Sequence, residues 1–94
     1  MLYTLSQAYY DQTELHTYLA YLNAQDAVVL WQDGVLAALK YADVWQNLPC
    51  DIFVLDIDVQ ARGIQHLISD NRFQSISLCQ LVKITENFSP QLAL

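Results

Sequence analysis

The sequence predicts an α/β fold, with a single small domain (residues 1–94) whose open, mainly parallel sheet of four to five strands is flanked by helices. Short apolar runs alternate with helix-like segments, and the connections between them are short. One junction is especially informative, because an apolar run ends at Gln32-Asp33-Gly34 and a helix-like run begins at once. A strand that turns directly into a helix is typical of the βα unit of an open parallel sheet.

The expected strands are short and mostly apolar. The segment at residues 27–31 is apolar on both faces, as expected of a central parallel strand. The segment at residues 74–78 alternates between polar and apolar side chains, and the last segment is expected at the edge of the sheet. The five expected strands are Leu2–Leu5, Ala27–Trp31, Asp51–Leu55, Gln74–Leu78 and Leu92–Leu94.

The first helix is marked by a cap and a stripe. Asp11 and Glu14 have the spacing of a capping box, with Asp11 as N-cap. A buried stripe follows at helical spacing, formed by Leu15, Tyr18, Leu19 and Leu22.

A second helix is expected to follow Asp33 as its N-cap and to stop at Pro49. Its expected apolar side consists of Val35, Ala38, Leu39, Ala42 and Trp45.

Two further helices are expected in the C-terminal half. Asp56-Ile57-Asp58 is expected to cap a short helix that ends in a left-handed turn at Arg62-Gly63. A polar turn is expected at Ser69-Asp70-Asn71. The last helix is expected over about Gln80–Asn87, with Leu81, Ile84 and Phe88 on one face, and Pro90 ends it.

The composition indicates a protein that meets a partner. Apolar residues make up 54% of the chain, charged residues only 15%, and Tyr, Trp and Phe number 6, 2 and 3. Such a small domain has little interior to fill, so part of this apolar surface is expected at an interface, although an unusually well-filled core is the alternative.

The charge and the hydrophobic pattern exclude several classes of function. The net charge is −6 and there are only four Lys and Arg residues, so direct binding of nucleic acid is not expected. No apolar run approaches the roughly 20 residues that span a bilayer, and no signal peptide is indicated. Two cysteines are too few for a disulfide scaffold, so a cytoplasmic location is expected.

Candidate site residues are sought in the loops after the strands, because these meet at one edge of a parallel sheet. Cys79 is the one candidate nucleophile, in the first turn of the last helix, where the helix dipole favours a thiolate. The alternative is a small apolar filler between sheet and helix. The loops are Ser6–Tyr10, Gln32–Gly34, Asp56–Asp58 and Ser77–Gln80.

The other chemistry-bearing residues favour structural roles. Cys50 lies at the amino end of its strand and is expected to fill core space. His16 and His66 have no metal-ligand spacing, so no metal site is predicted. No phosphate-binding glycine pattern is present, and no cofactor is expected. Gly34 allows a close backbone approach, either to a ligand or to a neighbouring subunit.

The sequence resembles the TusB/DsrH family from end to end. The resemblance rests on several short motifs in a fixed order: Met1-Leu-Tyr-Thr-Leu-Ser6, Leu30-Trp-Gln-Asp-Gly-Val35 with Ala37-Ala38 after it, Asp58-Val-Gln-Ala-Arg-Gly63, the segment from Phe73 to Thr85, and Gln91-Leu-Ala.

The resemblance implies a subunit of a cytoplasmic sulfurtransferase complex, a heterohexamer with TusC-like and TusD-like sister subunits. Such a complex takes persulfide sulfur from a TusA-like donor and passes it to a TusE-like acceptor, for 2-thiouridine at the tRNA wobble position. The active cysteine belongs to the TusD-type sister. Relatives from sulfur-oxidising bacteria carry a further cysteine in the first helix, and Glu14–Leu22 contains none, which favours the tRNA branch.

Three hypotheses follow. The first is a non-catalytic interaction subunit, with Gln32, Asp33 and Gly34 as a partner-facing turn and with no catalytic residue. The second is a subunit that carries persulfide on Cys79. The third is a small-ligand binding module that uses the Gln32-Asp33-Gly34 edge.

Overall fold

In a computed structural model, which describes residues 1–68 and 72–94, five parallel strands form one sheet in the order β4-β3-β2-β1-β5. The predicted parallel α/β sheet is therefore confirmed. The expected turn at residues 69–71 lies outside the described residues. The strands are β1 (Leu2–Leu5), β2 (Ala27–Leu30), β3 (Asp51–Leu55), β4 (Phe73–Ile76) and β5 (Gln91–Ala93).

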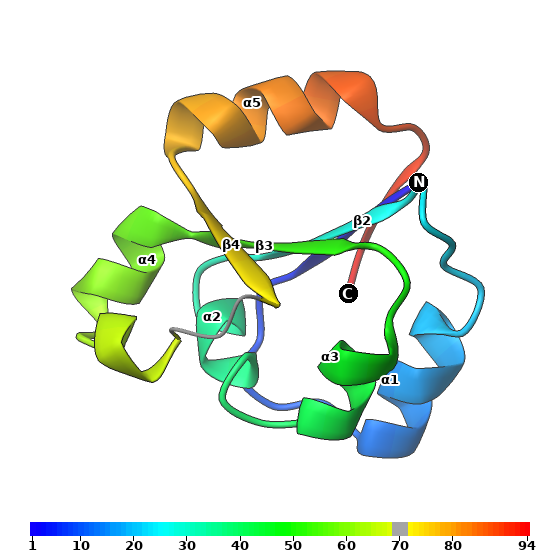
Figure 1. The fold of residues 1–94 in the computed structure, drawn as a ribbon, viewed down its shortest axis with the longest axis horizontal. Coiled ribbons are helices and arrows are strands. Elements are labelled where there is room, and N and C mark those ends of the chain that lie inside the picture. The colour runs from blue at the N-terminus through cyan, green and yellow to red at the C-terminus, as the bar shows by residue number, and fades with distance from the viewer. Residues whose placement is uncertain (69–71) are drawn as a thin grey trace.

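The helices cover the two faces of the sheet unequally, as Figure 1 shows. The helices α1 (Gln12–Leu19), α2 (Gly34–Ala37) and α3 (Ala42–Asn47) lie on one face, and in the described part of the chain α5 (Leu78–Asn87) is the helix that crosses the other face. The short helix α4 (Asp56–Ala61) and the 3₁₀ turn η1 (Gln65–Leu67) follow β3 at the end of the sheet where the strands finish.

The core is divided by the sheet in the same way. Beneath the three helices lies the larger cluster, which includes Leu15, Leu30 and Trp45. Beneath α5 lies a smaller cluster, in which Leu81 is buried and Ile84 and Phe88 are partly buried, as their spacing predicted. The stripe of α1 is confirmed for its leucines, but Tyr18 is 46% exposed and does not belong to it.

The expected single helix over residues 35–45 is wrong, because two helices, α2 and α3, divide this segment. Tyr41 between them has a φ of 56°, which is the left-handed region and breaks the helix. The Trp45 indole donates to the carbonyl oxygens of Ala37 (3.0 Å) and Lys40 (2.7 Å). The indole thereby adds a donor at the end of α2, where the Ala37 oxygen also accepts from the Lys40 N–H.

The last helix begins two residues earlier than predicted, and β4 ends correspondingly sooner. Ser77 is the N-cap, and its hydroxyl accepts from the Gln80 N–H while the Gln80 side chain accepts from the Ser77 N–H. This reciprocal capping box fixes the start of α5.

Asp11 caps α1 as predicted, since its carboxylate accepts from the Glu14 N–H at 3.0 Å. Gly63 ends α4 in a left-handed conformation, φ 64°, also as predicted.

Candidate functional site

The carboxyl ends of β2, β3 and β4 are neighbours in the sheet, so the segments that follow them meet at one edge. These segments are the turn at residues 32–34, the first turn of α4 and the first turn of α5. The candidate site residues that the sequence indicated after these strands all lie here.

The turn at residues 32–34 is packed against its own chain. A Cβ atom on Gly34 would lie 1.9 Å from the carbonyl oxygen of Leu5, so that only glycine fits. Gly34 is thus the site of a close approach, but its neighbour is β1 of the same chain and not the ligand or neighbouring subunit expected from the sequence. Trp31 N–H also donates to the Leu5 oxygen, at 3.1 Å.

Gln32 is held in a conformation that is unusual for a residue other than glycine. Its φ is 53°, and its N–H donates to Oδ2 of Asp58 at 2.7 Å. The carboxylate from α4 thus fixes a strained turn after β2.

Asp33 occupies the expected N-cap position of α2, but the expected capping hydrogen bond is absent. Asp33 precedes α2 but has helical dihedral angles, and its side chain caps no N–H. Oδ1 of Asp33 instead pairs with Nη2 of Arg62 at 2.7 Å. The same guanidinium donates to the Asp58 carbonyl at 3.1 Å and lies 3.6 Å from the Asp58 carboxylate. Arg62 therefore ties the turn to α4.

The capping role expected of Asp56 and Asp58 is also wrong, because the N-cap of α4 is Leu55 and no side chain caps this helix. Asp58 bridges to the neighbouring turn instead. Sequence reasoning missed Arg62 as a site residue. The signal for it was the four-residue spacing from Asp58 to Arg62, which places both on one helix face.

The two cysteines have opposite surroundings. Cys79 lies in the first turn of α5, as predicted, but it is exposed and so does not fill space between sheet and helix. Cys50 is buried, as predicted, and burial raises the pKa of its thiol above the usual value. Only Cys79 is therefore accessible to a reagent or a partner.

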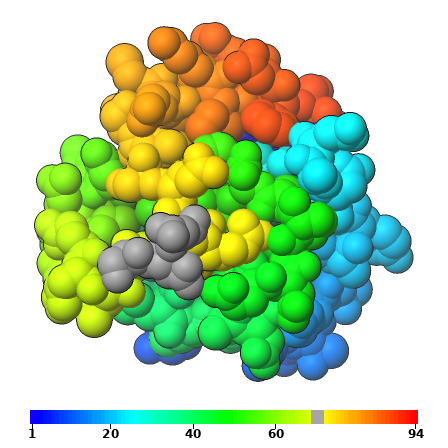
Figure 2. Space-filling view, viewed as in Figure 1, coloured from blue at the N-terminus to red at the C-terminus, as the bar shows by residue number. Residues whose placement is uncertain are grey.

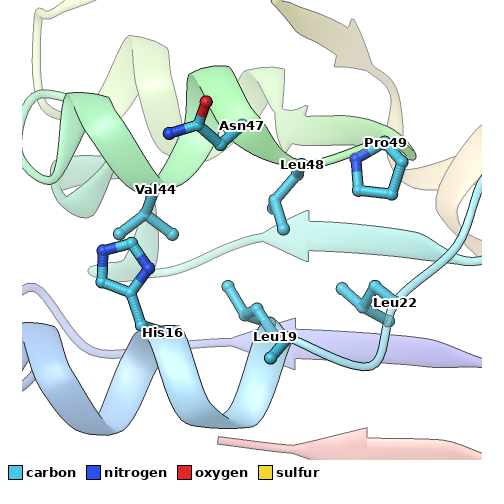
Figure 3. A pocket seen from close by; sticks show the side chains of 8 residues that line it. His16, Leu19, Leu22, Val44, Asn47, Leu48 and Pro49 are labelled. Carbon is cyan, nitrogen blue, oxygen red and sulfur yellow. The ribbon is translucent and has the colours of Figure 1, made fainter.

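The histidines lie away from this edge. His16 is exposed on α1 and lines a cavity of about 170 Å³ between α1 and α3, together with Leu19 and Val44 (Figure 3). His66 is exposed in η1. Within residues 1–68 and 72–94, no group of three or more His, Cys, Asp and Glu side chains could hold a metal ion.

The turn at residues 32–34 lies outside the other cavities of the described chain, and no membrane-spanning helix is found there. Further cavities of about 230 and 140 Å³ lie beside α4 and beneath α5, and residues 32–34 line neither of them. No helix in the described part of the chain is long and apolar enough to cross a membrane.

Comparison with known proteins gives a consistent result. The family of DsrH like proteins matches residues 8–91. An uncharacterized protein from Haemophilus influenzae is 46% identical over 95 residues and is covered completely, as is this chain. Protein TusB from Yersinia pestis is 41% identical over 96 residues, with 99% of each chain covered.

A solved structure supports the fold. The solution NMR structure of protein Tm0979 from Thermotoga maritima superposes with a TM-score of 0.62, at 24% identity and with 93% of each chain covered. Relatives match this chain along its full length, and the family match covers most of the chain. The chain therefore belongs to the TusB/DsrH family.

Proposed function

We propose that this chain is a non-catalytic interaction subunit of a sulfurtransferase complex, which relays persulfide sulfur for 2-thiouridine formation at the tRNA wobble position. Membership of the TusB/DsrH family supports a role in the tRNA sulfur-relay system, and sister subunits are part of what that membership implies. In this proposal the protein is cytoplasmic and forms a heterohexamer with TusC-like and TusD-like subunits. A TusA-like donor and a TusE-like acceptor act through the complex, and this chain does not bind the tRNA itself.

The observation that carries the proposal is that the polar groups at the carboxyl edge of the sheet pair with one another. In most open α/β sheets this edge holds a ligand or a catalytic group. Here Gly34 packs against the Leu5 carbonyl. The Asp33 carboxylate pairs with Arg62, which also donates to the Asp58 carbonyl, and the Asp58 carboxylate accepts from the Gln32 N–H. Polar groups that would bind a ligand are thus used to hold the turn in one shape, which suits a surface that a partner contacts.

Exposed apolar side chains are the second support. Ten large hydrophobic side chains are exposed among the described residues, from several elements. A soluble chain of this size that exposes so many is expected to cover some of them in an assembly.

Co-expression tests the proposal. A tagged copy of this chain is produced with the TusC-like and TusD-like proteins of the same organism, and the purified material is weighed by native mass spectrometry. The proposal predicts a stoichiometric complex with both sisters. Recovery of this chain as a monomer, with neither sister bound, would overturn it.

The exposure of Cys79 favours one alternative, a subunit that carries sulfur itself. In that reaction the Cys79 thiolate would attack the outer sulfur of a donor persulfide, and the donor cysteine would leave as a thiolate. Incubation with a persulfide-loaded TusA-like donor, followed by mass spectrometry of the intact chain, tests it. Added sulfur that is lost in a Cys79→Ser variant would establish this alternative, and the buried Cys50 provides the internal control.

A further inference from the structure

We infer that an apolar surface at the carboxyl edge, made of Trp31, Ile57, Leu78 and Val82, binds a protein partner whose facing surface has an apolar centre and a rim of lysine and arginine. This inference rests on the proposed function and specifies the surface that serves it. Ile57, Leu78 and Val82 are 57%, 59% and 51% exposed, and Trp31 is partly buried.

Sheet topology brings these side chains together. Trp31 follows β2, Ile57 follows β3 and Leu78 follows β4, and these three strands are neighbours in the sheet. Adjacent strands lie about 4.8 Å apart, so the three positions fall within a short distance along one edge. In the space-filling view, α4 and the first turn of α5 lie next to each other on the same side of the molecule (Figure 2).

The helix α5 extends this surface by one turn. Leu78 and Val82 are four residues apart and lie one above the other on a helix face. Thr85, one further turn along, lines a cavity of about 140 Å³ together with Trp31 and Leu81. Trp31 therefore lies beside the flank of α5 on which Leu78, Val82 and Thr85 are neighbours at four- and three-residue spacing.

Charge decides which kind of partner fits. Asp33, Asp56 and Asp58 border the surface, and Arg62 is the opposite charge within α4 and the turn at residues 32–34. In α5, Lys83 is balanced by Glu86. The whole chain carries a net charge of −6. A second copy of this chain, a nucleic acid or an anionic lipid surface would be repelled, whereas a protein with a basic rim would be attracted.

The surface is also held in shape before binding. The Asp58 carboxylate fixes the turn through the Gln32 N–H, and Arg62 ties Asp33 to α4. A rim that needs no ordering when the partner arrives avoids part of the entropic cost of association.

The experiment uses the co-expressed complex with the TusC-like and TusD-like proteins. Ile57→Lys with Val82→Lys alters the surface at two exposed positions. Tyr18→Lys with Tyr21→Lys, at positions 46% and 85% exposed, makes the same change in and beside α1. Circular dichroism confirms that both variants are folded, and the sister proteins retained by each tagged variant are quantified.

We expect the Ile57/Val82 variant to retain the sisters at least about tenfold less than the unchanged chain, and the Tyr18/Tyr21 variant to retain them fully. We also expect Asp56→Asn to release them at lower salt concentration, because part of the attraction to the basic rim is lost.

The two proposals fail in different ways. If the unchanged chain retains neither sister, the proposed function is overturned and this inference with it. If the unchanged chain retains both and the Ile57/Val82 variant does so equally well, only this inference is overturned. The same conclusion follows if the Tyr18/Tyr21 variant is the one that loses them.

Discussion

Gly34 shows how one residue fixes the contact between two strands and a turn. Its Cα faces the Leu5 carbonyl so closely that even a methyl group would overlap with backbone atoms. The glycine in the turn could be read from the sequence, together with a close approach. Its neighbour could not, because Leu5 lies far earlier in the chain and reaches Gly34 only through the pairing of β1 with β2.

Gly34→Ala is therefore expected to destabilise the protein by about 3 kcal/mol, since the Leu5 backbone cannot move away without disturbing the sheet. Urea denaturation measures this change. Gly63→Ala is the comparison: unlike Gly34, Gly63 has a positive φ, but no atom lies within 4 Å of the added Cβ, so only about 1 kcal/mol of conformational cost is expected. Equal losses for the two variants would show that Gly34 is not packed in this way.

Asp26 links stability to pH at the residue scale. The Asn23 N–H at 2.8 Å, and then the Met1 amino group at 2.9 Å, lower the pKa of this carboxyl below its usual value. A lowered folded-state pKa means that Asp26 stabilises the protein above the unfolded value of about 3.9. This contribution is lost as the pH falls through the folded-state pKa.

We therefore expect acid to destabilise the unchanged chain more steeply than Asp26→Asn, which cannot titrate. Urea midpoints measured from pH 6 down to pH 3 test this. Parallel curves for the two proteins would contradict the assigned role of Asp26.

At the scale of elements, the break between α2 and α3 shows where the sequence pattern was insufficient. Trp45 lies on the predicted apolar side and is buried, so the periodicity correctly identified a core residue. It did not reveal that the indole N–H would turn back to the carbonyl groups at the end of α2. The Tyr41 hydroxyl, which donates to the Tyr10 carbonyl and accepts from the Tyr10 N–H, is a second tertiary contact that supports the break.

Trp45→Phe should cost about 2 kcal/mol in unfolding free energy, because it removes the indole hydrogen bonds to the Ala37 and Lys40 carbonyl oxygens as well as part of a buried ring. Trp31→Phe provides the comparison, since its Nε1 has no acceptor among the described residues and removing that donor relieves an unsatisfied group. The smaller loss is expected for Trp31→Phe in chemical denaturation. The reverse order would contradict the capping role of Trp45.

The parallel sheet and most element boundaries could be predicted because they depend on local signals, such as the Asp11 cap and the apolar runs. The interactions of the candidate site could not. Asp33 has the sequence context of an N-cap, but Arg62 is supplied by another element and takes its carboxylate instead. A side chain with two plausible partners can be assigned only when the tertiary structure is known.

At the scale of the whole molecule, the polar groups at the carboxyl edge hold the fold together, and the exposed surface beside them is apolar. The sheet presents a carboxyl edge, but the polar groups there are engaged in holding the turn, and apolar side chains form the exposed surface beside them. Among the described residues, α1, α2 and α3 cover one face of the sheet and α5 alone covers the other. Such an arrangement suits a chain that acts within an assembly.

The central claim is that this chain contributes a surface to the sulfur relay, and not a sulfur-carrying cysteine. The most direct test is the 2-thiouridine content of tRNA, measured by mass spectrometry of nucleosides, in cells whose own copy of this gene is deleted and replaced by a Cys79→Ser variant. The account predicts loss of 2-thiouridine in the deletion strain and full restoration by Cys79→Ser. A Cys79→Ser chain that still assembles with its sisters but restores no 2-thiouridine would contradict it.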